Sequence, residues 1–369
     1  MAGIYIHIPF CEQACHYCNF HFATSLRHKN EMIAALLKEI ELQKLYLGNE
    51  TIETIYFGGG TPSLCTMGEL QNMMEKVFSS FQVSANAEVT IEVNPDDITV
   101  EKLQGWEKAG INRLSIGILS FFEEDLKWMN RAHNSQQAID NLLLAKKYFD
   151  NITIDLIYGT PLLTDEKWKY NVDMTIQFNI PHLSCYALTV ESKTPLYKMI
   201  QQNKMENVNS DKQAEQSLLL MQWTEEAGYE HYEISNFAKP GFRSQHNSLY
   251  WKGKKYLGIG PSAHSFNVVS RQWNISNNNI YIESINKGVI PFEKEELTAT
   301  QKLNEYIMTS LRTIEGLNLT IMEEALSYKL RTASKKYLLS GKLIEENNFL
   351  KLTKQGKLLA DGIAADLFF

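Results

Sequence analysis

Apolar and polar positions follow a regular order through the first half of the chain, where a short apolar run precedes an amphipathic segment six times. Short apolar runs predict buried strands, and apolar residues spaced by three or four positions predict helices. Residues 3–9 predict the first strand, and residues 30–46 a helix with Ile33, Leu36 and Ile40 on one face. Further strands are predicted at residues 53–57, 88–94, 112–117, 152–158 and 182–187.

The segments between these strands have the start and stop signals of helices. Thr66 and Glu69 form the pattern of a capping box, and Gly110 ends a helix predicted over residues 99–109. Six strand-then-helix units in series favour parallel strands joined by right-handed crossovers. We therefore predict an α/β fold with a partial (β/α)6 barrel over residues 1–205. An open, doubly wound sheet is the main alternative, because periodicity does not separate the two. Other helices are predicted at residues 123–130, 135–148 and 165–177.

The rest of the chain divides into two parts. Residues 206–296 are less regular, and we predict an irregular connecting region that holds a helix at about 211–227 and the segment QHNSLYW. Residues 297–369 predict a C-terminal α+β module that resembles a winged helix. Its predicted parts are helices at 298–313, 320–327 and 333–340, a hairpin in GKLIEENNFLKLT, and a final helix.

Composition and charge exclude several classes of protein. Hydrophobic residues make up 44% of the chain and charged residues 21%, which is ordinary for a globular protein. The net charge of −7 argues against a polyanion binder, so no nucleic-acid partner is expected. The N-terminus lacks the features of a signal peptide, and no apolar run is long enough to span a membrane. An odd number of clustered cysteines fits a reducing cytoplasm, so we expect a cytoplasmic protein that is not integral to the membrane.

Three of the five cysteines, Cys11, Cys15 and Cys18, lie within eight residues directly after the first strand. In a (β/α) barrel this loop emerges at the C-terminal ends of the strands, where such folds place their chemistry. Three thiolates can hold three irons of a [4Fe–4S] cluster and leave the fourth iron open to a substrate. The alternative is a structural zinc site completed by a histidine. Nearby histidines are His7, His16 and His21, whereas Cys65 and Cys185 are predicted to be ordinary buried thiols.

A glycine-rich segment and a carboxylate end the next two strands. In Gly58–Pro62 (GGGTP), the glycines allow a ligand close to the backbone, whose N–H and C=O groups can hold the charged ends of an amino acid. A simple turn is the alternative. Glu92, in IEVNP, is placed to accept hydrogen bonds from a ligand, or it is a solvated or capping acid.

Three more side chains are candidates for ligand binding. Arg131 suits a bidentate hydrogen bond to a carboxylate, or it is an exposed helix residue. Asp155 lies among apolar strand residues, so its carboxylate needs a partner, and a ligand hydroxyl would serve. Tyr5, in the first strand, either packs as an aromatic ring or turns its hydroxyl toward the ligand.

The C-x3-C-x2-C loop, with Tyr17 before its last cysteine, resembles that of the radical S-adenosylmethionine (SAM) superfamily. The resemblance implies a fourth iron chelated by SAM, whose reductive cleavage gives a 5′-deoxyadenosyl radical. IHIPFC, YFGGGTPS, IEVNP, NRLSIG and DLIYG resemble one branch, which holds oxygen-independent coproporphyrinogen III dehydrogenase and the radical SAM haem chaperones. The resemblance implies these SAM-binding positions: Tyr5, Gly59, Gly60, Thr61, Glu92, Arg131 and Asp155.

Two positions depart from the pattern of this branch. Leu119 stands where the family normally has a glutamine, so one polar contact with SAM is lost. Phe20 stands where the dehydrogenase has a further cysteine, two residues beyond Cys18. The dehydrogenase also has a longer segment before its cysteines. Phe20 and the shorter segment before the cysteines favour the haem chaperones, whereas Leu119 concerns only the affinity for SAM or its geometry.

His246 begins the segment HNSLYW, which resembles the HNxxYW motif of the haem chaperones, whose histidine is implicated in holding haem. A neutral imidazole can ligate iron, and Tyr250 and Trp251 offer flat apolar surface for a macrocycle. The alternative is an exposed loop histidine beside two packed aromatic residues. His264 is a second candidate.

The favoured interpretation is a haem chaperone with a [4Fe–4S] cluster and bound SAM that delivers haem to membrane and respiratory haem proteins. Coproporphyrinogen III dehydrogenase, which decarboxylates two propionates to vinyl groups by radical chemistry, is the alternative function. A zinc-stabilised binding module is a third possibility, and whether the chain forms a homodimer is open.

Overall fold

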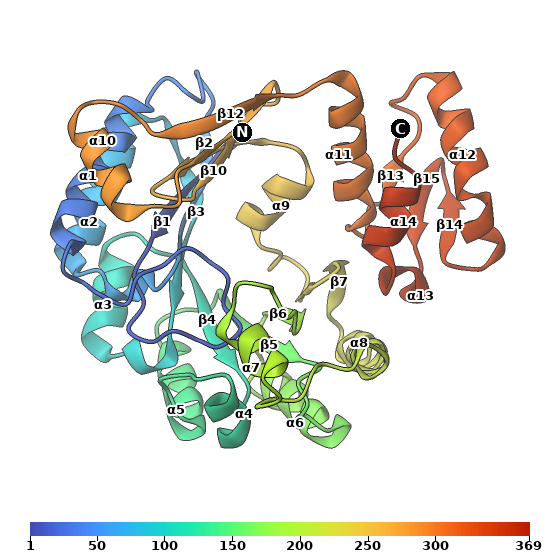
Figure 1. Cartoon of the computed structure of the whole chain (residues 1–369), viewed down its shortest axis with the longest axis horizontal. Coiled ribbons are helices and arrows are strands. Elements are labelled where there is room, and N and C mark those ends of the chain that lie inside the picture. The colour runs from blue at the N-terminus through green and yellow to red at the C-terminus, as the bar shows by residue number, and fades with distance from the viewer.

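Six parallel strands lie side by side in the order in which they occur in the chain (Figure 1), in a computed structural model that describes residues 1–369. Each pairs in parallel with the next. This order has no reversal, so every crossover runs in the same direction, whereas a doubly wound sheet reverses near its middle. The predicted α/β fold with a partial (β/α)6 barrel is confirmed. The strands are β1 (Ala2–Ile8), β2 (Ile52–Gly59), β3 (Val83–Val93), β4 (Arg113–Leu119), β5 (Ile152–Tyr158) and β6 (His182–Ala187).

The helices between these strands cover the outer face of the sheet (Figure 1). The predicted capping box is present: Glu69 N donates to Thr66 Oγ1 over 3.2 Å, and Thr66 N donates to Glu69 Oε2 over 2.7 Å. The predicted bounds of these helices hold to within a few residues. They are α1 (Lys29–Leu42), α2 (Met67–Ser80), α3 (Val100–Lys108), α4 (Glu123–Trp128), α5 (Ser135–Ala145) and α6 (Asp165–Gln177).

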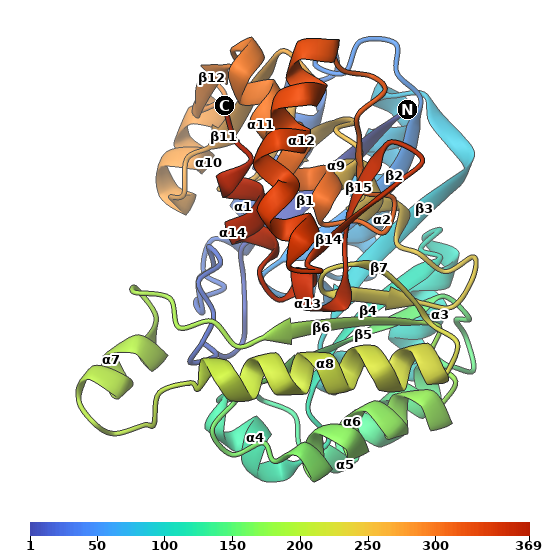
Figure 2. The same cartoon turned by 90° about the vertical axis from the view of Figure 1, so that its right-hand side faces the viewer.

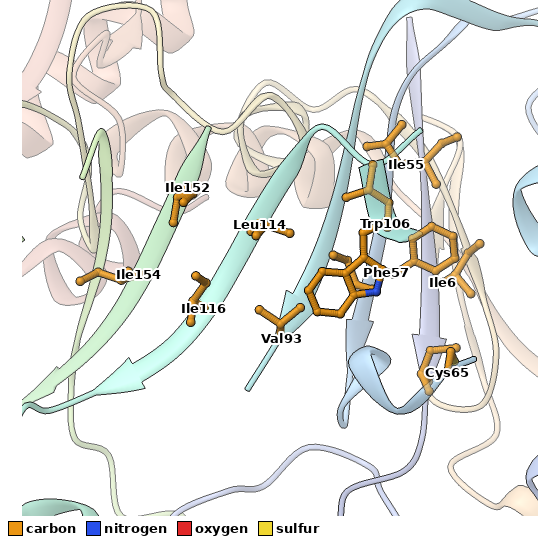
Figure 3. Packing of buried hydrophobic residues seen from close by; sticks show 14 of the residues in the cluster. Ile6, Ile55, Phe57, Cys65, Val93, Trp106, Leu114, Ile116, Ile152 and Ile154 are labelled. Carbon is orange, nitrogen blue, oxygen red and sulfur yellow. The ribbon is translucent and has the colours of Figure 1, made fainter. Parts of the chain in front are cut away.

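The two faces of the sheet differ in polarity. On the outer face, Ile4, Ile6 and Ile8 are fully buried and belong to a core of 53 buried residues. Trp106 of α3 is also fully buried and belongs to this core, which continues along the sheet through Phe57, Leu114 and Ile154 (Figure 3). Side chains alternate between the faces of a strand, so the residues between the apolar ones line the inner face. By register they include Tyr5, Gly58, Glu92, Ser115 and Asp155.

The prediction of an irregular region over residues 206–296 is wrong, because these residues add six strands to the sheet. One pair extends the β6 edge, and four strands extend the β1 edge to give a 12-stranded sheet. The strands are only three to five residues long, which is too short to show a clear alternation, and Phe292–Glu296 is exposed throughout. The elements are β7 (Glu230–Glu233), β8 (Asn236–Ala238), β9 (Lys255–Ile259), β10 (His264–Phe266), β11 (Ser270–Asn274) and β12 (Phe292–Glu296).

Four helices accompany these strands. The long helix α8 (Ser210–Glu226) runs alongside α6 (Figure 2), and its position agrees with the predicted helix at 211–227. The short helix α9 (Gln245–Trp251) carries the segment QHNSLYW and packs against β1, β2 and β9. The other two are α7 (Pro195–Gln201) and α10 (Asn278–Asn286).

The C-terminal residues form a separate core of 12 buried side chains around a three-stranded sheet. The predicted hairpin is confirmed, and its turn residues Asn347 and Asn348 have positive φ angles of 51° and 64°. The two helices predicted at 320–327 and 333–340 are one helix, because no Gly or Pro interrupts residues 324–339. The elements are α11 (Ala299–Leu311), β13 (Leu317–Asn318), α12 (Glu324–Leu339), β14 (Leu343–Glu346), β15 (Phe349–Leu352), α13 (Lys354–Lys357) and α14 (Ala360–Asp366).

The winged-helix assignment and the division of the chain at residues 205 and 296 stay predictions. None of the helices combines the length and the apolar character needed to cross a lipid bilayer.

Candidate cofactor site

A cavity of about 490 Å³ opens at the C-terminal ends of the parallel strands. Its size is within the range of about 300–1,000 Å³ that is common for small-molecule sites. The loop after β1 forms one wall, and the ends of β2 to β6 form the floor and the opposite wall. The lining includes Cys11, Cys15, Cys18, Gly59, Gly60, Thr61, Glu92, Leu119, Arg131 and Asp155.

The three clustered cysteines all line this cavity and are half-buried. Burial raises the pKa of Cys11 to about 11 and also raises the pKa of Cys18. The thiols of Cys11 and Cys18 are therefore protonated in the unliganded protein, and metal binding must displace their protons. No group of three or more His, Cys, Asp and Glu side chains has the arrangement that a single metal ion needs. Cys65 and Cys185, which are predicted bystanders, are buried elsewhere in the core.

The cysteine loop is held in place by the segment that follows α4. Gln13 Nε2 donates to Asn130 O and Oδ1 over 3.0 and 2.9 Å, and Asn130 Nδ2 donates back to Ala14 O over 2.8 Å. His16 N donates to Met129 O over 3.1 Å. Asn130 has a positive φ of 58°, which Asn tolerates better than most residues. Neither Gln13 nor Asn130 was predicted from the sequence, although Asn130 precedes the candidate Arg131.

Arg131 connects the cysteine loop to the strands. Its Nη1 donates to Cys15 Sγ over 3.4 Å, and its Nη2 donates to Asn94 Oδ1 over 2.8 Å and to Gly117 O over 3.1 Å. Its Nε is buried without a hydrogen-bond partner. A buried unpaired donor is costly, so Nε is available to an acceptor on a ligand.

Two carboxyl groups lie on the floor of the cavity. Glu92 accepts hydrogen bonds from Tyr56 Oη over 2.9 Å and from Gly59 N over 3.1 Å. Burial raises the pKa of Glu92 to about 7, despite the hydrogen bond from Tyr56. Burial likewise raises the pKa of Asp155 to about 6. A bound cationic ligand would lower the pKa of both carboxyl groups, so that both are ionised at neutral pH.

The glycine segment lets the cysteine loop approach the end of β2 closely. A Cβ atom at Gly60 would lie 2.4 Å from the backbone oxygen of Phe10, and one at Gly59 would lie 2.6 Å from the His7 ring. Gly59 also has a φ of 111°, which favours glycine. Both glycines are therefore needed for the packing of the protein itself, in addition to any contact with a ligand.

The two departures from the family pattern both line the cavity. Leu119 is 5% exposed and has a φ of 67°, at an irregularity in the pairing of β4 with β5. Phe20 is 68% exposed beside the cysteine loop. The structure thus places an apolar side chain, with no thiol, two residues beyond Cys18.

Six of the seven predicted SAM-binding residues line the cavity, and Tyr5 does not. The Tyr5 hydroxyl lies 3.0 Å from His7 Nδ1, and its ring stacks against Tyr56 with the centroids 6.1 Å apart. Tyr5 therefore lies behind the residues that form the cavity floor. Other polar lining residues that were not predicted from the sequence include Asn94, Ser115 and Tyr186.

His246 is not part of the cavity lining. It is 1% exposed and lies on α9, packed against the inner face of the sheet. Its Nδ1 is 2.7 Å from Thr54 Oγ1, and its Nε2 is 2.8 Å from Tyr250 Oη. The alternative of an exposed loop histidine is wrong, and both ring nitrogens already have partners within the chain. His264 is exposed, with its ring centroid 6.1 Å from that of Trp273.

A partial barrel whose first loop brings three cysteines to the strand ends defines a radical SAM protein, and the family model of the Radical SAM superfamily matches residues 5–174. Heme chaperone HemW of Bacillus subtilis is 31% identical over 371 aligned residues, which cover 98% of each chain. Heme chaperone HemW of Mycobacterium tuberculosis strain H37Rv is 32% identical and covers 99% of this chain and 94% of its own. The chain belongs to the HemW family.

A solved structure of coproporphyrinogen III oxidase (HemN) from Escherichia coli, described as a radical SAM enzyme, has the same fold. Its TM-score is 0.86 over 100% of this chain and 90% of that chain. The sequence identity is 21%, so this likeness concerns the fold alone.

Proposed function

We propose that this chain is a haem chaperone, which binds haem and transfers it to haem-dependent proteins of the membrane and the respiratory chain. The observation that carries the proposal is the match to heme chaperones along nearly the whole chain, including the C-terminal module. Phe20 supports it, because the related dehydrogenase is expected to have a cysteine at that position.

We further propose that Cys11, Cys15 and Cys18 hold a [4Fe–4S] cluster. Their shared cavity fits the group, because each thiolate of such a cluster binds its own iron and the three sulfurs need not surround one ion. When bound, the cluster supplies an open iron and one-electron chemistry. Arg131, through its contact with Cys15 Sγ, places a positive charge beside the sulfur that would carry the negative charge of the cluster.

The remaining cavity is the proposed site of SAM. Glu92 and Asp155 provide carboxylates for its positive charge and its ribose, and the backbone of Gly59, Gly60 and Thr61 is placed to hold the ends of its amino-acid part. The unpaired Nε of Arg131 is a donor for its carboxylate. Tyr5 does not contact SAM in this proposal, and its ring instead stacks against Tyr56 beneath the cavity floor.

Haem ligation by His246 stays a prediction. In the present arrangement it requires the ring to leave Thr54 and Tyr250, and α9 to move away from the sheet. The cytoplasmic location, the identity of the haem acceptors and a homodimer likewise stay predictions.

Anaerobic reconstitution followed by haem titration tests the proposal against the dehydrogenase alternative. We expect about four irons per chain, as a [4Fe–4S] cluster requires, and saturable haem binding seen in the Soret band. A parallel incubation with SAM, dithionite and coproporphyrinogen III should give no vinyl product. Stoichiometric decarboxylation without haem uptake would instead establish the dehydrogenase. Zinc in place of iron after native purification would favour the binding module.

A further inference from the structure

The buried environment of His246 points to a different use of this side chain. We propose that His246 is a positioning residue, which fixes the ring of Tyr56 so that the Tyr56 hydroxyl holds Glu92 in the SAM cavity. This inference rests on the proposed function, because it assumes that the cavity binds SAM. It makes no use of His246 as an iron ligand.

The imidazole is held from both ends. Nδ1 contacts Thr54 Oγ1 on β2 at 2.7 Å, and Nε2 contacts Tyr250 Oη on α9 at 2.8 Å. One ring nitrogen of a neutral imidazole donates and the other accepts, so both are used and no lone pair is free for a metal. Burial lowers the pKa of His246 to about 3, so the ring is neutral.

The ring of Tyr56 lies against this fixed imidazole. Their centroids are 5.0 Å apart with an interplanar angle of 27°, and Tyr5 stacks on Tyr56 with centroids 6.1 Å apart. A phenol confined by two neighbouring rings has little freedom to turn. Its hydroxyl therefore stays directed at Glu92 Oε1, at 2.9 Å.

The strand that carries Glu92 also anchors α9. Glu88, four residues before Glu92 and on the same face of β3, accepts hydrogen bonds from the backbone N–H groups of Gln245 and His246, each over 3.0 Å. Arg113 Nε lies 3.9 Å from Glu88 and balances its buried charge. The helix is thus tied to β2 and β3, the two strands that carry Tyr56 and Glu92.

The first strand is shaped to admit the histidine. A Cβ atom at Gly3 would lie 2.7 Å from Thr54 Oγ1, 3.0 Å from Leu249 Cδ1 and 3.3 Å from His246 Cε1. Only glycine leaves space for the imidazole and its Thr54 partner at this depth. The close fit indicates that α9 belongs against the sheet in the working protein.

The test compares SAM affinity and haem affinity in the cluster-loaded full chain, by anaerobic calorimetry and Soret titration. We expect His246→Ala to weaken SAM binding about tenfold, which corresponds to the contribution of one hydrogen bond, and to leave the iron content unchanged. Tyr56→Phe should weaken SAM binding similarly, and the double variant no further, because both changes release the same carboxylate. His28→Ala, at an exposed position, is the matched control.

His246→Phe keeps a ring against Tyr56 without the hydrogen bonds and should retain more SAM affinity than His246→Ala. If His246→Ala does not fold, the comparison is made with His246→Phe and Tyr56→Phe. Unchanged SAM affinity in these variants, or additive losses in the double variant, would overturn the inference. Lost haem affinity with unchanged SAM affinity in His246→Ala would overturn it in favour of an iron ligand. Absence of haem binding by the unaltered protein concerns only the proposed function.

Discussion

The guanidinium of Arg131 donates a hydrogen bond to the sulfur of Cys15, with Nη1 3.4 Å from Sγ. The same side chain donates to Asn94 and to the backbone of Gly117, so it fastens the cysteine loop to β4 and to the end of β3. A fixed positive charge beside a cluster ligand has consequences for the cluster as well as for the ligand in the cavity.

Replacing Arg131 with Met should lower the midpoint potential of the reconstituted cluster and weaken SAM binding. Reduction adds negative charge to the cluster, and a hydrogen bond and positive charge at a thiolate favour that state. A redox titration followed by electron paramagnetic resonance measures the potential, with Arg331→Met in the C-terminal module as the control. A potential equal to that of the unaltered protein would remove Arg131 from the cluster environment.

Replacing any one of the three loop cysteines with Ala should abolish stable cluster binding. Iron and sulfide content should fall from about four of each per chain toward background, because each cysteine holds one iron. Cys65→Ala is the matched control, since Cys65 lies in the core and not in the cavity. Its iron content should equal that of the unaltered protein. Full iron content in a loop variant contradicts the assigned ligand set.

SAM affinity should fall as the pH falls from 8 to 5.5. The pKa of Glu92 is raised to about 7 and that of Asp155 to about 6, so both carboxyl groups become protonated in this range and attract a cationic ligand less. Glu92→Gln should bind SAM more weakly at pH 8 and lose the part of the pH dependence centred near 7. Calorimetry across this range checks both expectations, and identical pH profiles for the two proteins would contradict them.

The same shifts affect the stability of the unliganded protein. A carboxyl group with a raised pKa binds more protons in the folded than in the unfolded state, so its contribution is greatest at low pH. The pKa of Glu92 is 4.5 in an unfolded chain and about 7 in the folded protein. The contribution of Glu92 to the free energy of unfolding should therefore decrease as the pH rises from 4.5 to about 7. Denaturant unfolding of Glu92→Gln should show a smaller decrease over this interval.

Replacing Leu119 with Gln should strengthen SAM binding about threefold to tenfold, by an added hydrogen bond to the ligand. Leu119 lines the cavity at the position where the family resemblance implies a glutamine. Leu119→Met, similar in volume but without a hydrogen-bonding amide, is the control. If Gln and Met give the same affinity, the side chain at this position does not reach the ligand.

Replacing Gly60 with Ala should destabilise the protein by about 1–3 kcal/mol, because the added Cβ would lie 2.4 Å from the backbone oxygen of Phe10. Cluster retention should fall as well, since the displaced backbone leads into Cys11. Gly68→Ala in α2 is the control, because nothing lies within 4 Å of its Cβ position. Equal unfolding free energies for the two variants would show that the loop adapts without cost.

The sequence was informative about the barrel because its parallel strands are apolar on the helix-covered face, as Ile4, Ile6 and Ile8 illustrate. It was uninformative about the added edge strands, because a five-residue edge strand such as Phe292–Glu296 needs no apolar face. For the same reason the region after residue 205 was predicted to be irregular.

The candidate site shows a similar division. Glu92, near the end of β3, and the cysteines that follow β1 could be predicted to meet, since the C-terminal ends of parallel strands share one edge of the sheet. The burial of His246 could not be predicted. It depends on Thr54, which is 192 residues away in the sequence, and on the space left by Gly3. No local pattern reports contacts of this kind.

Haem transfer to an acceptor protein is the decisive test of the proposed chaperone function. The cluster-loaded protein, charged with one haem per chain, is mixed anaerobically with the haem-free form of a respiratory haem protein in membrane vesicles, and the Soret bands of both proteins are followed. We predict that haem leaves the chain and appears in the acceptor faster than from free haem at the same concentration. Retention of haem, or transfer no faster than from free haem, would contradict it.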